Sequence, residues 1–115
     1  MGRMITNRLG RHVGLALVLL AGPTIAGCAA KRNMALEQSR AAYLQAQQNP
    51  DIATNAPVAL HEAEATLQRA EQTWEKTKDE KEVAHLVYLT EKQVDVATIT
   101  AEQKMAEAEA QRLNG

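Results

Sequence analysis

The sequence predicts an all-α protein: an antiparallel helical hairpin of the coiled-coil kind with an additional N-terminal helix, preceded by a signal peptide. Three observations predict this class. An apolar run followed by a lone cysteine opens the chain, apolar residues after it recur at spacings of three and four, and glycine and proline are rare there. Because the chain has 115 residues, one small domain is the most that it can form.

The first 27 residues have the order of a bacterial export signal. A positively charged stretch comes first, formed by Arg3, Arg8 and Arg11. The apolar run VGLALVLLA follows at 13–21, and Gly22-Pro23 then breaks it. A membrane-spanning helix needs roughly 20 apolar residues, about twice the length of this run. We therefore interpret 1–27 as a signal peptide that is removed rather than as a permanent anchor.

Cys28 stands at the expected cleavage point. It follows the aliphatic Ile25 and the small residues Ala26 and Gly27, and these four residues resemble the lipobox of bacterial lipoproteins, in which the cysteine thiol is acylated before the signal is cut. We expect cleavage between Gly27 and Cys28, acylation of Cys28 by fatty acids such as palmitate, and a short tether over 28–33. Each buried CH₂ of an acyl chain contributes about 0.8 kcal/mol to membrane binding.

The residue after the cysteine and the charge balance predict the location and exclude one class of partner. Ala29 is not acidic, and among lipoproteins this is what outer-membrane sorting usually shows. We therefore expect a lipid-anchored protein of the cell outer membrane that faces the periplasm. After signal removal 10 basic and 14 acidic residues remain, so nucleic acid is not an expected partner.

The mature chain is expected to form a helical domain over 34–113 that begins with a helix at about 31–48. Helix-favouring residues fill that range, and one flank of it carries Leu36, Tyr43, Leu44 and Gln47. Asn49-Pro50 ends it, because proline disfavours a helical residue before it. We expect a loop over 49–56, after which Pro57 suits the first turn of the next helix.

Two further helices are expected at about 57–77 and 80–113, joined as a hairpin. The apolar seam of the first, Leu60 to Trp74, cannot continue in phase into the second, so the chain must break between them. Asp79 with Glu82 three residues later has the form of a capping box. In an antiparallel pair Trp74 would face Val83. The predicted hairpin core contains Leu60, Leu67, Trp74, Val83, Val87 and Val94.

The helix 80–113 carries a second apolar stripe formed by Leu86, Leu89 and Val96. Helix 57–77 cannot cover both stripes, so this one needs helix 31–48, another protomer or a different protein. We treat it as the candidate interaction face. The end of helix 80–113 also outruns the hairpin, and the sequence leaves open whether helix 31–48 packs beside the hairpin or extends along that end.

No set of residues predicts catalysis, a cofactor or a metal site. His61-Glu62 begins like a zinc-protease helix motif, but the second histidine would stand at position 65, where alanine is found. His61 and His85 are out of register in the hairpin. Ser39 is the only serine and a lipid would block Cys28, so the basis for nucleophilic catalysis is small. We expect a protein that is not an enzyme and needs no cofactor.

Two segments resemble a known family. Ala56-Pro57-Val58 before the seam of the second helix, and AHLVYL at 84–89, are similar to the pattern of bacterial envelope lipoproteins classed as domain of unknown function 4398. The resemblance covers about 34–101 and implies no reaction. Relatives commonly carry a peptidoglycan-binding domain of the outer membrane protein A type after this segment. The given sequence has none, so we expect any association with peptidoglycan to be indirect.

Together these observations predict a non-catalytic structural or interaction protein, tethered to the membrane by its lipid, that binds another envelope protein or itself. The alternative is a periplasmic carrier of a small apolar ligand or lipid. A carrier needs a cavity between helices, which close packing at alanine positions disfavours.

Overall fold

The computed structural model describes residues 31–115, and residues 33–115 form one compact unit. This unit contains the helices α2 (Met34–Gln48), α3 (Pro50–Asn55), α4 (Pro57–Thr77) and α5 (Glu80–Asn114), and no strand is found in it. The predicted all-α class is confirmed. The predicted signal peptide, the cleavage point at Gly27 and the lipidation site at Cys28 lie outside the described residues.

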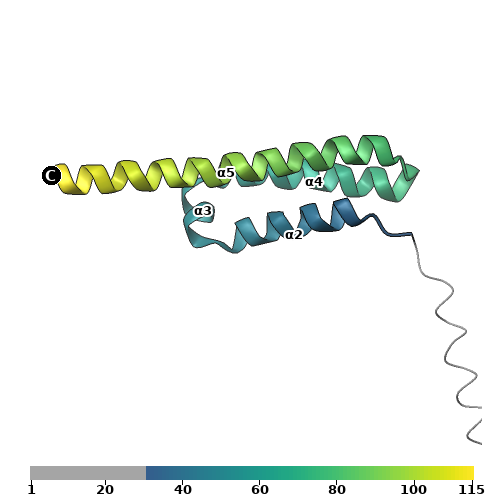
Figure 1. The fold of residues 1–115 in the computed structure, drawn as a ribbon, viewed down its shortest axis with the longest axis horizontal. Coiled ribbons are helices and arrows are strands. Elements are labelled where there is room, and N and C mark those ends of the chain that lie inside the picture. The colour runs from purple at the N-terminus through teal and green to yellow at the C-terminus, as the bar shows by residue number, and fades with distance from the viewer. Residues whose placement is uncertain (1–30) are drawn as a thin grey trace, which may run out of the picture. The chain divides into compact units, whose positions relative to one another are not determined.

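The helices α4 and α5 form the antiparallel hairpin, and α2 lies beside it (Figure 1). The short helix α3 connects α2 to α4 at the end of the bundle opposite the α4–α5 turn (Figure 1). The question that the sequence left open is thus answered, because the first helix contacts both helices of the hairpin. The last part of α5 extends beyond α2, α3 and α4.

Asparagine caps set the two ends of α2, and one of them corrects a prediction. The Asn33 side chain accepts a hydrogen bond from the Leu36 N–H at 3.0 Å, so α2 begins at 34 rather than at 31. The stretch predicted as a loop over 49–56 contains a helix instead. Asn49 caps α3 by accepting from the Asp51 N–H at 3.0 Å, Pro50 occupies its first turn, and the buried Ile52 holds it against the core.

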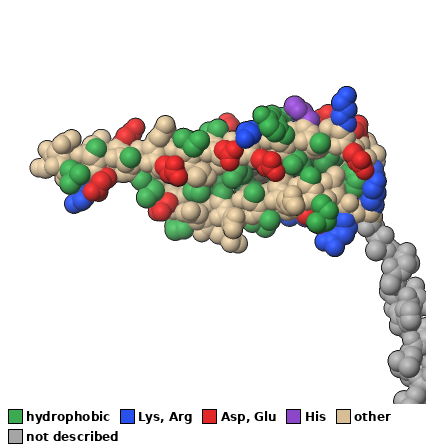
Figure 2. All heavy atoms as spheres, viewed as in Figure 1, with side chains coloured by type: hydrophobic (Ala, Val, Ile, Leu, Met, Phe, Trp, Pro, Cys, Tyr) green, Lys and Arg blue, Asp and Glu red, His purple; other side chains and the backbone are tan. Residues whose placement is uncertain are grey.

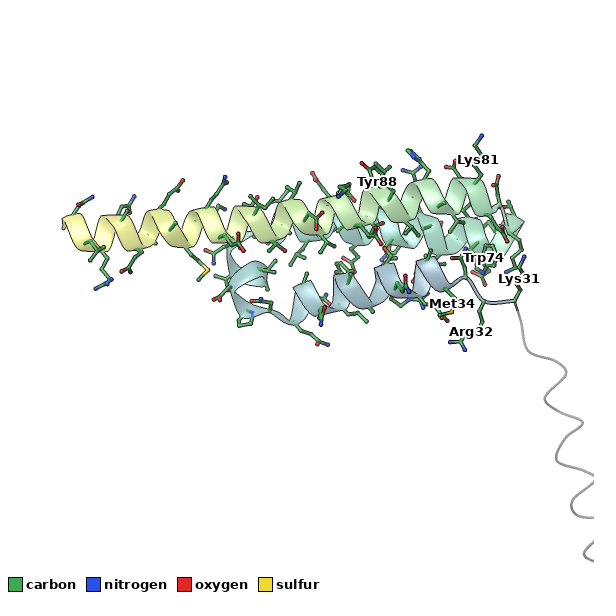
Figure 3. The ribbon with its side chains drawn as sticks, viewed as in Figure 1. Lys31, Arg32, Met34, Trp74, Lys81 and Tyr88 are labelled. Atoms are coloured by element: carbon green, nitrogen blue, oxygen red, sulfur yellow. The ribbon has the colours of Figure 1, made fainter. Side chains whose placement is uncertain are left out.

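The α4–α5 turn is tight and capped on both sides. Lys78 adopts a left-handed conformation with φ of 54°, and its N–H donates to the Trp74 carbonyl at 3.1 Å. The Asp79 carboxylate then accepts from the N–H groups of Lys81 and Glu82, both at 3.1 Å. The Lys78 ammonium lies 5.1 Å from the centre of the Trp74 ring, at the turn end of the bundle (Figure 3).

The core runs along the contact of α2, α4 and α5. Of the predicted hairpin core, five side chains are buried and Val94 is partly buried against them; the five are Leu60, Leu67, Trp74, Val83 and Val87. Three alanines of this contact, Ala63, Ala70 and Ala97, are fully buried, which lets the helices approach closely. From α2 the buried side chains are Leu36, Ser39, Tyr43 and Ala46, whereas Leu44 and Gln47 of the predicted flank are exposed.

Candidate interaction surface

Leu86, the first residue of the predicted interaction face, does not belong to an exposed surface. It is 2% exposed and shares one core cluster with Leu36 and Tyr43 of α2. The prediction was wrong at this position because α2 lies beside the hairpin and covers the beginning of the second stripe. Leu89 is half-buried, and Val96 is 53% exposed. Only the later part of the predicted face is therefore open.

The exposed apolar side chains of α5 lie on the side of the helix opposite the core. We call this the outer stripe, and it consists of Tyr88, Val96, Ile99 and Leu113, each more than half exposed. At 100° per residue these positions point away from Val83, Thr90 and Ala97, which are fully buried. Figure 2 shows hydrophobic side chains between charged ones along the visible side of α5, out to its far end.

The last thirteen residues of α5, Glu102–Asn114, form a projecting end that no other described helix covers. Ala101 is 2% exposed, whereas every residue after it is exposed. The helix α5 extends past the start of α4 (Figure 1), so its core-facing side has no facing helix along the projecting end. At 1.5 Å per residue the projecting end is about 20 Å long.

The seam nevertheless continues in sequence past the point where α4 begins. Val94, Ala97 and Ala101 are followed at the same side of α5 by Met105 and Ala108. Met105 is 43% exposed. The projecting end thus carries two apolar faces, the continued seam with Met105 and the outer stripe with Leu113.

Ion pairs along α5 are local and stabilise the helix. Lys92 lies 3.2 Å from Asp95 and 5.7 Å from the centre of the Tyr88 ring. Arg112 makes two hydrogen bonds to Glu109, at 2.6 and 2.9 Å. These bonds lower the pKa of Glu109 and raise the pKa of Arg112, with slight desolvation opposing both shifts. Pairs at this spacing stabilise a helix locally, so they explain a charged exterior without a ligand.

A shallow cavity lies beside the level at which α4 begins. Its volume is about 280 Å³, and it is lined on the α4 side by Pro57, Val58 and Ala59 and on the α5 side by Thr100 and Lys104. Val58 is 71% exposed at its mouth. The cavity is mainly apolar and lies next to the first residues of the projecting end.

The described residues offer no arrangement for metal binding. Among them no group of three or more His, Cys, Asp or Glu side chains could hold an ion. His61 and His85 are both exposed, and the Nδ1 of His61 lies 3.8 Å from the Glu64 carboxylate. Within residues 31–115, none of the helices combines the length and hydropathy needed to cross a membrane.

The structure defines an all-α protein with a helical body, residues 33–101, and one helix extended past that body. The sequence profile of a family described as a domain of unknown function (DUF4398) matches residues 34–113, a range that includes nearly all of the four helices. The chain belongs to this family, as its sequence pattern predicted. No curated protein and no solved structure matches the chain.

The sequence left the exposure of Met105 open. It predicted that helix 80–113 outruns the hairpin, but not whether helix 31–48 covers that end, and the structure shows Met105 43% exposed there. Leu113 was not assigned to any face. Its spacing of fourteen residues from Ile99, two heptads, was the signal that could have placed it on the outer stripe.

Proposed function

We propose that the mature chain is a non-catalytic interaction protein of the outer membrane, held by a lipid on Cys28 and facing the periplasm, in which α5 binds a protein partner. The observation that carries this proposal is the projecting end of α5. It is a continuous helix with both of its apolar faces open, and its exposed side chains include Met105 and Leu113.

Binding to a protein explains this surface better than solvent exposure alone. Isolated apolar residues on a surface need no explanation, but several on one helix face at spacings of three and seven are typical of helix-in-groove recognition. Val96 and Ile99 are three residues apart and are each 53% exposed. With Leu86 covered by α2, the proposed face begins at Val96 and continues along the projecting end.

The tether joins the described helices at the end opposite the proposed face. Asn33 is five positions after Cys28, and an extended chain of five residue steps spans at most about 18 Å. The beginning of α2 lies at the turn end of the bundle (Figure 1), and α5 runs away from that end for 35 residues. At 1.5 Å per residue α5 is about 52 Å long, so the projecting end and the start of α2 lie at opposite ends of the described helices.

Photo-crosslinking in cells tests the binding proposal. We expect a photoreactive residue at Ile99 or at Met105 to give a discrete adduct, because both side chains are exposed on α5. The matched control is Gln68, which is exposed on α4 in the body. Equal yields at all three positions, or no adduct at Ile99 and Met105, would show that α5 is not a binding surface.

Lipidation is tested separately with Cys28→Ser. We expect the variant to lose acyl labelling and to accumulate as the longer precursor, because the lipobox thiol is the acceptor in lipoproteins. Membrane fractionation and mobility on a gel measure both effects. Retained label and unchanged mobility in Cys28→Ser would contradict the anchor.

A further inference from the structure

We propose that the outer side of α4 near the α4–α5 turn contacts the phosphate groups of anionic phospholipids, in the same bilayer that holds the lipid anchor. We call this surface the donor face, and it consists of Arg69, Gln72, Thr73 and Lys76. The inference rests on the proposed function for the anchor, but it concerns a different surface from the binding face of α5. It is carried by the donor groups of this face, by its unpaired cations and by its position near the tether.

The donor face is one side of α4, turned away from the core. Its residues stand three, four and seven positions after the first, so they share one side of the helix. Ala70 and Trp74 of the same turns are buried on the other side. Together with Thr77 the donor face lines a shallow cavity of about 220 Å³. Every lining side chain carries an N–H or O–H donor and none is a carboxylate, so the cavity suits an anion.

The two cations of the donor face have no carboxylate partner. Arg69 and Lys76 are exposed, and within residues 31–115 neither forms an ion pair. By contrast Arg40, Lys92 and Arg112 each lie within 3.2 Å of a carboxylate oxygen. A guanidinium binds phosphate oxygens through two parallel hydrogen bonds, and an ammonium binds them as a point charge. The donor face can therefore meet phosphate groups without breaking an ion pair of its own.

The donor face lies at the end of the body from which the tether starts. The helix α2 begins at the turn end of the bundle (Figure 1), and α4 ends there at Thr77. Five residue steps from Cys28 to Asn33 span at most about 18 Å. The axes of packed helices are about 8–10 Å apart, so a tether of this length lets α4 contact the bilayer surface.

The charges of α4 limit this contact to its turn half. Glu62 stands seven residues before Arg69, on the same side of the helix, and it is exposed. Glu75 is next to Lys76 in sequence, but consecutive residues point about 100° apart around a helix. An anionic surface attracts the turn half of this side and repels the half that carries Glu62. The contact would hold the turn end at the bilayer and leave the projecting end of α5 directed away from it.

Energy transfer from Trp74 to a dansyl-labelled lipid headgroup tests the contact. Trp74 is the only tryptophan of the chain and lies two residues from Lys76. The full-length lipidated protein is inserted into vesicles of phosphatidylcholine, with or without phosphatidylglycerol. We expect more transfer when phosphatidylglycerol is present, because the anionic surface attracts the turn half of α4. In about 0.5 M NaCl, which screens exposed charges, the transfer should fall to the value in phosphatidylcholine alone.

The decisive variant is Arg69→Gln combined with Lys76→Gln. We expect it to lose the increase caused by phosphatidylglycerol and to keep its circular dichroism, because both side chains are exposed. The matched control is Lys104→Gln combined with Arg112→Gln, which removes the same number of positive charges from the projecting end. We expect the control to keep the increase.

Three outcomes would overturn the inference: no increase in the wild-type chain, an increase that survives in the donor-face variant, or an equal loss in the control. Flotation of the vesicles in about 0.5 M NaCl separates this result from the anchor, because only chains held by their lipid float when exposed charges are screened. If the chains float, a failed transfer test contradicts the donor face alone. If they do not float, the anchor is wrong, and flotation of the same variants at low salt then tests the donor face.

Discussion

The helix α5 runs without a break from the helical body into the projecting end, but its two parts are stabilised in different ways. In the body, α5 buries Val83, Leu86 and Thr90 against two other helices. In the projecting end no described helix faces it, and helix-favouring alanines and glutamates together with the Glu109–Arg112 pair maintain the helix.

The difference shows that one seam can serve two purposes. Up to Ala101 its apolar positions hold the chain together, and after Ala101 the same spacing has no internal partner. Substitutions in the body should therefore change the stability of the fold, whereas those in the projecting end should change association and leave the fold intact.

The largest contrast is expected between two leucines of the same helix. Leu86→Ala should lower the free energy of unfolding by about 2–5 kcal/mol, because it removes a side chain that is 2% exposed and leaves a cavity. Leu113→Ala, in which the leucine is 70% exposed, should change it by less than about 0.5 kcal/mol. Urea unfolding followed by circular dichroism measures both. Similar losses in the two variants would mean that the projecting end is part of the cooperative body.

The capping of α5 is expected to be the next largest effect. Asp79→Ala should lower the free energy of unfolding by about 1 kcal/mol, because the N–H groups of Lys81 and Glu82 lose their acceptor. Asp79→Asn is the matched control, since its side-chain oxygen can still accept. If Asp79→Asn were as unstable as Asp79→Ala, the cap would not explain where α5 begins.

A buried hydroxyl of α2 should give an effect of opposite sign. The Ser39 Oγ is fully buried and has no hydrogen-bond partner, whereas the equally buried Thr90 hydroxyl donates to the Leu86 carbonyl at 2.9 Å. Ser39→Ala should raise the free energy of unfolding by about 1 kcal/mol, because it removes an unpaired buried polar atom. Thr90→Val, which loses a made hydrogen bond, should not raise it. Thermal unfolding of both variants measures these effects. A destabilised Ser39→Ala would contradict the claim that the unpaired Ser39 hydroxyl destabilises the fold.

The smallest effect is expected at the Glu109–Arg112 pair. Its hydrogen bonds lower the pKa of Glu109, so the pair supports the helix above the ordinary carboxyl range and loses this contribution as the pH falls through the lowered pKa. A carboxyl NMR titration should show the pKa of Glu109 below the ordinary carboxyl range, and Arg112→Gln should bring this pKa back to that range. An equal pKa of Glu109 in wild type and in Arg112→Gln would show that the pair does not stabilise the helix.

Much of the body could be predicted from the sequence because its signals are local. Apolar spacing, the asparagine and aspartate caps and the phase break before Asp79 are all visible without tertiary contacts. The position of α2 could not be predicted in this way, because it depends on which of the two apolar faces of α5 the side chains of α2 contact. For that reason Leu86 was assigned to the candidate interaction face although α2 covers it, and Ser39 was not expected in the core.

The helix α3 escaped prediction for another reason. Asn49-Pro50 reads as a helix end, but the same two residues are a good helix start, and six residues are too few for periodicity to decide. The hairpin register predicted that helix 80–113 outruns its partner, but the exposure of Met105 also required that α2 lie beside the hairpin rather than along that end, and the sequence left this choice open.

Hydrogen exchange of the lipidated protein, purified as separated chains and again in its native membrane, tests the central claim most directly. In separated chains we expect slow exchange for the amides of Val83 to Ala101 and fast exchange for Glu102–Asn114, because only the former are packed against other helices. In the membrane the projecting end should become protected while the body stays unchanged. Equal protection of the two regions in separated chains, or no gain at the projecting end in the membrane, would contradict the account.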